Sequence, residues 1–85
     1  MSIFSERLKE LRSERNVSQK DVASAIDLSL RGFQYYEADK KEPTLSKVVA
    51  LAEYFDVSID YLVGRTDNQA AHKTDYTRPL MLVSE

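Results

Sequence analysis

Cysteine is absent from this 85-residue chain, and glycine and proline occur only twice each. Without cysteine the chain can form neither a disulfide framework nor a thiolate metal site, so packing alone must stabilise the fold. The scarcity of glycine and proline favours helices, because these two residues interrupt helices most strongly. We therefore expect one small helical domain that holds no metal ion and no cofactor.

Membrane-spanning and enzymatic signatures are also missing. No apolar run approaches the roughly 20 residues that cross a bilayer, and the N-terminus lacks the basic-then-apolar pattern of a secretory signal. We therefore expect a cytoplasmic protein that does not enter a membrane. The sole histidine is His72, near the C-terminus, and no glycine-rich phosphate loop occurs. Nothing in the sequence therefore indicates an enzyme.

The formal net charge of -2 at pH 7 is a mild warning against a nucleic-acid ligand, since phosphate binders usually carry net positive charge. The acidic residues are unevenly distributed, however. Residues 1–41 carry eight Lys or Arg and seven Asp or Glu, whereas residues 42–64 carry one and four. Because the charge of the presented face matters more than the total, DNA stays open as a partner.

Apolar residues spaced three and four positions apart predict five short helices. The first covers residues 3–15, where Ser2 can cap it, and Asn16 can end it in a left-handed conformation. The second covers residues 19–26 and begins with a Ser18 cap. The residues expected to face inward from these two helices are Phe4, Leu8, Leu11, Val22, Ala23 and Ile26.

The third helix is expected to run from a Ser29 cap to Glu37, followed by a polar loop that ends in Pro43. A fourth helix starts after Thr44, and Ser58 caps a fifth. The residues expected to form the apolar faces of these three helices are Phe33, Tyr36, Leu45, Val48, Leu51, Ala52, Phe55, Ile59, Leu62 and Val63. No useful period-two alternation precedes residue 64, so the predicted fold class is all-α.

The composition changes after Gly64, which predicts a domain over residues 1–64 and a C-terminal tail over residues 65–85. The tail is polar at first and then carries Pro79 and the apolar run Leu80–Val83. Two interpretations stay open for this tail. It is disordered on composition grounds, or its apolar run contacts a second chain, a protein partner or the domain itself.

The segment from Gln19 to Glu37 resembles the helix-turn-helix of the lambda-repressor and Cro-like (XRE-type) family, and the similarity extends over residues 3–64. The features that carry it are Ser18-Gln19 at the start of the second helix, Ala23 at a close helix approach, inward Phe33 and Tyr36, Glu37 before the loop, and the closing segment from Phe55 to Gly64. The resemblance implies a compact five-helix DNA-binding domain. It also implies a phage- or mobile-element-like repressor that binds a palindromic operator in double-stranded DNA as a homodimer.

Two positions depart from the family pattern. Asp27 stands at the turn where the family often has glycine, and aspartate is among the few residues that tolerate a positive φ. Gly32 falls inside the third helix, where it costs about 1 kcal/mol relative to alanine. It serves close packing or close approach to DNA, or it is a neutral replacement.

The outer face of the third helix is predicted to meet base edges in the major groove. The residues on that face are Leu30, Arg31, Gln34 and Tyr35. Arginine pairs bidentately with guanine and glutamine with adenine, while Leu30 suits a thymine methyl group and Tyr35 suits a base or a phosphate. For Arg31 and Gln34 the alternative is an ordinary solvated helix face.

Residues that frame this helix are expected to contact phosphates: Gln19, Lys20, Ser29, Lys40 and Lys41. By resemblance, Gln19 grips the DNA backbone and also braces the recognition helix. Capping alone also explains Ser29, and solvent exposure alone also explains the lysines. By resemblance, Arg12 and Glu37 form a partly buried ion pair that joins the first helix to the third.

By resemblance, the last two helices supply a dimer surface through Tyr54, Val57, Ile59 and Tyr61, although the core is an equal alternative for Tyr61. The rival function on the same fold is a protein-interaction module, such as an antitoxin or an adaptor, with DNA binding secondary. The acidic balance and the Leu80–Val83 run favour that rival, whereas the glutamines, Arg31 and the two loop lysines favour DNA.

Overall fold

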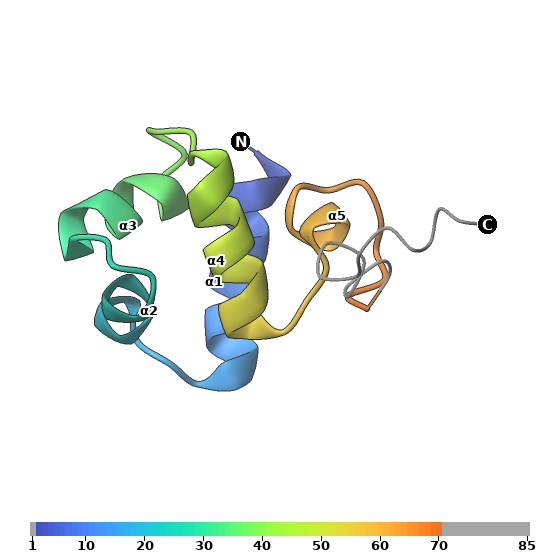
Figure 1. Ribbon diagram of the computed structural model, residues 1–85, viewed down its shortest axis with the longest axis horizontal. Helices are drawn as coiled ribbons and strands as arrows, with labels where there is room; N and C mark the ends of the chain where they lie inside the picture. Colours follow the sequence, from blue (N-terminus) through green and yellow to red (C-terminus); the bar gives the residue numbers. More distant parts are fainter. Residues whose placement is uncertain (1, 71–85) are drawn as a thin grey trace, which may run out of the picture.

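The computed structural model describes residues 2–70, and within that range every regular element is an α-helix and no strand occurs. The helices are α1 (Ile3–Arg15), α2 (Gln19–Ala25), α3 (Leu30–Glu37), α4 (Leu45–Phe55) and α5 (Ile59–Leu62) (Figure 1). All five predicted helices are present, and the all-α fold class is confirmed. In the view of Figure 1, α2 and α3 form one end of the molecule and α5 lies toward the other.

Every helix begins at a hydroxyl side chain that accepts a hydrogen bond from a backbone N–H three residues later. The caps are Ser2, Ser18, Ser29, Thr44 and Ser58. Asp21 completes a capping box with Ser18, since its carboxylate accepts the Ser18 backbone N–H. A hydroxyl cap satisfies one of the backbone donors that a helix start leaves unpaired, which is why short helices here begin at defined residues.

The four connections between helices each contain one residue with a positive φ: Asn16, Asp27, Asp39 and Asp56, at 56°, 57°, 61° and 58°. Asparagine and aspartate adopt this left-handed conformation more readily than other non-glycine residues. The left-handed end at Asn16 and the tolerated turn at Asp27 were both predicted. Asp39 and Asp56 adopt the same left-handed conformation after α3 and α4.

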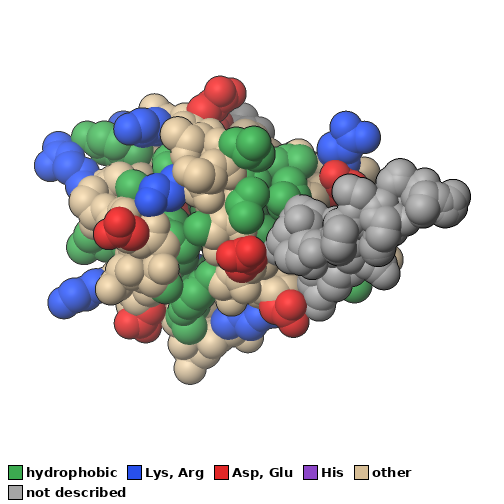
Figure 2. Space-filling view, viewed as in Figure 1, with side chains coloured by type: hydrophobic (Ala, Val, Ile, Leu, Met, Phe, Trp, Pro, Cys, Tyr) green, Lys and Arg blue, Asp and Glu red, His purple; other side chains and the backbone are tan. Residues whose placement is uncertain are grey.

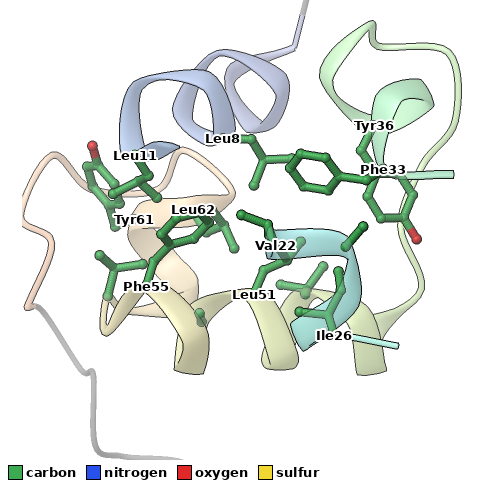
Figure 3. Packing of buried hydrophobic residues seen from close by; sticks show 14 residues of the cluster. Leu8, Leu11, Val22, Ile26, Phe33, Tyr36, Leu51, Phe55, Tyr61 and Leu62 are labelled. Carbon is green, nitrogen blue, oxygen red and sulfur yellow. The ribbon is translucent and has the colours of Figure 1, made fainter. Parts of the chain in front are cut away.

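One apolar cluster fills the space between the helices. Figure 3 shows α1 and α4 on opposite sides of the buried side chains, which α2, α3 and α5 complete. The fully buried large residues include Leu8 and Leu11 of α1, Phe33 of α3, and Leu51 and Phe55 of α4. Because an eight-residue helix such as α3 is not stable alone in water, this packing is what keeps it folded.

Three details of the predicted helices need correction. Leu45 is 74% exposed, because it is the first residue of α4 and lies at the end of the apolar stripe, where no other element covers it. Val63 is the C-cap of α5 and is exposed rather than part of its apolar face. Ile26 is the C-cap of α2 and not its last helical residue, yet its side chain is still buried in the core.

The segment after α5 stays attached to the domain as far as it is described. Arg7 of α1 donates hydrogen bonds to the Tyr61 carbonyl (2.6 Å), the Thr66 carbonyl (2.7 Å) and Asp67 Oδ1 (2.8 Å). The Gln69 carbonyl accepts from the Ser58 backbone N–H at 2.6 Å. Contacts therefore continue past the predicted boundary at Gly64, while Pro79 and the Leu80–Val83 run lie outside the described residues.

Replacing Gly64 with alanine is expected to lower the free energy of unfolding by about 1–3 kcal/mol. Its φ is +89°, and an added Cβ would lie 2.9 Å from Ile3 Cγ2. Urea denaturation followed by the helical circular dichroism signal measures the change.

Gly32→Ala is the matched control. It gains about 1 kcal/mol of helix propensity, which tight contacts offset, so its unfolding free energy should stay within about 1 kcal/mol of the wild type. The added Cβ would meet Leu28 and Ser29 side-chain atoms at 3.1 Å. Equal losses in the two variants would contradict the strain assigned to Gly64.

Candidate nucleic-acid interface

The helix α3 has one buried face and one exposed face. Phe33 and Tyr36 are buried, and the four predicted base-contacting residues are all exposed: Leu30, Arg31, Gln34 and Tyr35. Burial raises the pKa of Tyr36 above its usual 10.0, so this phenol stays neutral as part of the core. The structure thus brings the four predicted residues onto one open surface of one short helix.

Gly32 lies against the turn that precedes its own helix. A Cβ at this position would sit 3.1 Å from both Cδ1 and Cγ of Leu28 and 3.1 Å from Ser29 Oγ. Ser29 Oγ in turn accepts the Gly32 backbone N–H at 3.0 Å. Of the interpretations left open by the sequence, these contacts favour close packing.

The Glu37 carboxylate joins three helices. Arg12 of α1 donates to it twice, from Nε to Oε2 at 2.6 Å and from Nη2 to Oε1 at 3.2 Å. Gln19, the first residue of α2, donates from Nε2 to Oε1 at 2.8 Å. The Glu37 side chain is only 6% exposed and that of Arg12 is 24% exposed, so the pair is largely shielded from water. The geometry confirms the predicted ion pair and adds Gln19 to it.

A further hydrogen bond carries this network to the surface. Gln34 Nε2 donates to Gln19 Oε1 at 3.2 Å. A glutamine amide has two N–H donors and one acceptor oxygen, so Gln34 keeps one N–H and its oxygen available. That remaining pair matches the N7 acceptor and N6 donor of adenine. The Gln19 side chain therefore serves first as a brace between Glu37 and Gln34.

Arg31 and Tyr35 also interact with each other on the exposed face. Arg31 Nε donates to the Tyr35 hydroxyl at 3.0 Å, and the guanidinium carbon lies 5.6 Å from the centroid of the Tyr35 ring. The residues are four positions apart, the spacing at which side chains meet on a helix surface. Two of the predicted base-contacting side chains are thus hydrogen-bonded to each other.

The predicted phosphate-contacting residues surround α3. A surface hollow of about 480 Å³ lies beside α2 and the start of α3, and Lys20, Ser29 and Leu30 are among the residues that line it. Lys40 and Lys41 are exposed in the loop that follows α3. Figure 2 shows Lys and Arg side chains around the end of the molecule that α2 and α3 form, with acidic groups between them.

Lys47 of α4 holds the turn between α2 and α3, and the sequence reasoning missed it. Its Nζ donates to the carbonyl oxygens of Ile26 at 2.7 Å and Asp27 at 3.0 Å. These carbonyls end α2 and have no helical partner of their own, so a lysine there suits the negative end of the helix. The one sequence feature that singles out Lys47 is that it is the only basic residue between positions 42 and 64.

The four predicted dimer residues do not share one open surface. Val57 is fully buried and Tyr61 is 6% exposed, both within the core of a single chain. The interface assignment of Val57 is therefore wrong at the level of its side chain, which has no exposed surface, and the burial of Tyr61 agrees with the core alternative. Tyr54 is 37% exposed and Ile59 is half-buried, so these two remain accessible.

Metal-binding and membrane-spanning features were sought in the same part of the chain. Among residues 2–70, no three or more His, Cys, Asp or Glu side chains are grouped so that they could hold a metal ion. No described helix has the length and apolarity needed to cross a membrane. His72 lies outside the described residues.

Comparison with known proteins finds one matching family and several relatives. Residues 5–67 match the model of a helix-turn-helix domain. The uncharacterized HTH-type transcriptional regulator YobD of Bacillus subtilis is 36% identical over 66 residues, covering 78% of this chain and 59% of that protein. The cryptic phage CTXphi transcriptional repressor RstR of Vibrio cholerae is 35% identical over 77 residues, covering 91% and 63%. The chain thus spans less than two thirds of the length of either relative.

A solved structure has a similar fold. The crystal structure of a transcriptional regulator from Listeria innocua superposes with a TM-score of 0.70 at 25% sequence identity. The match covers 95% of this chain and 82% of that one. The similarity therefore extends over nearly the whole chain and is not limited to the α2–α3 segment.

Replacing Glu37 with glutamine is expected to lower the free energy of unfolding by about 2–4 kcal/mol, because it leaves Arg12 without its carboxylate in a shielded site. Glu14→Gln is the control, since Glu14 pairs with Arg15 at 3.1 Å where both side chains are well exposed. That change should cost less than about 1 kcal/mol. Urea denaturation of both variants measures the two losses of unfolding free energy. Similar losses would show that the Arg12–Glu37 pair stabilises the fold no more than the exposed Glu14–Arg15 pair does.

Proposed function

The chain belongs to the helix-turn-helix family, and from this premise we propose that it is a transcriptional regulator that binds double-stranded DNA sequence-specifically. These relatives are named as transcriptional regulators and repressors. One observation carries the proposal: α3 presents Leu30, Arg31, Gln34 and Tyr35 to solvent while Glu37 fixes its end to α1 and α2.

In this proposal α3 enters the major groove, where its exposed side chains reach base edges. Gln34 reads adenine with the N–H and oxygen that Gln19 leaves available. Leu30 contacts a thymine methyl group, and Arg31 and Tyr35 contact bases beside it. Between Leu28 and Tyr36 the only charged residue is Arg31, so no carboxylate of this segment repels the DNA.

Phosphate contacts frame the base contacts. Lys20 and Ser29 border the hollow beside α3, and Ser29 keeps its hydroxyl hydrogen for donation because its oxygen serves as the helix cap. Lys40 and Lys41 reach the backbone from the loop on the other side of the helix. Gln19 contributes its backbone N–H, since its side chain braces Glu37 and Gln34.

We propose that the chain acts in the cytoplasm as a repressor and binds a palindromic operator as a homodimer. One module has limited contact area, and two half-sites roughly add their binding energies. Tyr54 and Ile59 are the accessible residues for the contact between copies. The tail, with its Leu80–Val83 run, is a further candidate for contact with a second copy or a protein partner.

Selection from a pool of random duplexes tests the function directly. The full chain is expected to enrich an inverted repeat whose half-site centres are about 10 base pairs apart. Binding to the enriched duplex should weaken steeply with salt, because each neutralised phosphate adds about 0.9 to the slope of log affinity against log salt concentration. A slope of several units is expected from the proposed lysine and backbone contacts.

The control is a duplex of equal length in which one half-site is scrambled. It should bind much more weakly if two copies bind together. Equal affinity for the two duplexes would contradict the dimer on a palindrome. A pool without enrichment, or a flat salt response, would contradict DNA binding and favour a protein-interaction role.

Base-contacting and phosphate-contacting residues should respond differently to substitution. Gln34→Ala is expected to remove roughly 1–3 kcal/mol of preference at one base pair, whereas Lys40→Ala should weaken binding to all duplexes alike and lower the salt slope by about one unit. Titrations of the enriched duplex and its single-base variants measure both effects. Lys9→Ala, an exposed lysine of α1, serves as the control and should change neither. A uniform loss from Gln34→Ala would refute its assigned base contact.

A further inference from the structure

Arg31 differs from every other arginine in the described part of the chain. Each of the other four binds a carboxylate, and three of them also bind a backbone carbonyl: Arg7, Arg12, Arg15 and Arg65. Arg31 has neither kind of partner among residues 2–70, where its hydrogen bond goes to the hydroxyl of Tyr35. Its positive charge is therefore not neutralised by this segment of the protein.

Only the Nε–H group of the Arg31 guanidinium donates to Tyr35. Nε donates to the hydroxyl at 3.0 Å, while Nη1 and Nη2 have no hydrogen-bond partner among the described residues. The ring of Tyr35 also lies near the cation, at 5.6 Å from its centroid. With Nε held by the phenol, the N–H donors of both terminal nitrogens stay available, and the planar group fixes them in one fork geometry.

We propose that Tyr35 is a positioning residue that holds Arg31 ready to read one guanine of the operator through N7 and O6. The inference rests on the proposed DNA binding and adds to it the base and the device that selects it. Guanine presents two acceptors on its major-groove edge, which match the two terminal nitrogens, whereas adenine replaces one of them with an N–H donor.

The Tyr35 phenol is proposed to strengthen binding by holding the Arg31 side chain in one orientation before DNA binds. An exposed arginine samples many rotamers, and fixing such a side chain on binding weakens affinity by roughly two- to tenfold. The hydrogen bond to Tyr35 meets part of that cost before DNA arrives. Tyr35→Phe removes the hydroxyl and keeps the ring, so it should release Arg31 without removing it.

The experiment uses the full chain and the duplex that the wild type enriches from a random pool. Each guanine of that duplex is replaced in turn by 7-deazaguanine, which keeps base pairing and O6 but lacks the N7 acceptor. The wild type should lose about tenfold or more in affinity at one guanine per half-site. Arg31→Ala should bind the normal and substituted duplexes equally.

Tyr35→Phe is the decisive variant. It should reduce the preference for guanine over 7-deazaguanine by about two- to tenfold, and it should leave that preference unchanged in the Arg31→Ala background. Loss of the fold would weaken binding to the normal and the 7-deazaguanine duplex alike, so it would not change the preference between them. Thermal melting of Tyr35→Phe and Arg31→Ala, expected to match the wild type, checks that both variants are folded. The conservative Arg31→Lys should also lose the preference, because it keeps the charge but not the fork.

Three outcomes would overturn the inference. Tyr35→Phe could leave the preference at the wild-type value, or weaken binding to both duplexes equally, which would make Tyr35 a phosphate contact. Alternatively, no guanine substitution could matter to the wild type. In each case the enriched duplex still demonstrates DNA binding, so only the inference fails. A chain that enriches no duplex would overturn the inference and the proposed function together.

Discussion

The Glu37 carboxylate accepts hydrogen bonds from Arg12 of α1 and Gln19 of α2 while standing at the end of α3. A buried carboxylate is stable only when its lone pairs are satisfied, so the three helices must keep one relative arrangement. Gln34 extends that constraint to the surface through Gln19. The orientation of the exposed face of α3 therefore depends on an interaction that lies almost wholly out of solvent.

A second set of contacts limits how α3 can move. Lys47 of α4 binds the carbonyls that end α2, and Gly32 lets the start of α3 pack against Leu28. An eight-residue helix has little stability of its own, so these contacts and the core hold it in place. Short helices with hydroxyl caps and left-handed turns thus fix where α3 lies and which of its faces is exposed.

The sequence predicted local structure well, but among side-chain contacts between distant residues it predicted only the Arg12–Glu37 pair, and that by resemblance. Caps and left-handed turns depend on a few neighbouring residues, so Ser18, Asn16 and Asp27 could be interpreted directly. Burial depends on what other elements cover. Leu45 was therefore expected inside and lies outside, while Val57 was assigned to an interface and lies in the core. The bonds of Lys47 and Arg7 join residues far apart in the chain, and no spacing rule predicts them.

The most direct test of the account is a nuclear magnetic resonance titration of the isotope-labelled chain with its enriched duplex. The account predicts that amide shifts concentrate in α3, at the Gln19 and Gln34 side chains and in the Lys40–Lys41 loop. Amides of α1 and of the buried face of α4 should hardly change, because α3 is already held in its binding orientation. Large shifts throughout the core, or shifts confined to the surface of α4 and α5, would contradict it.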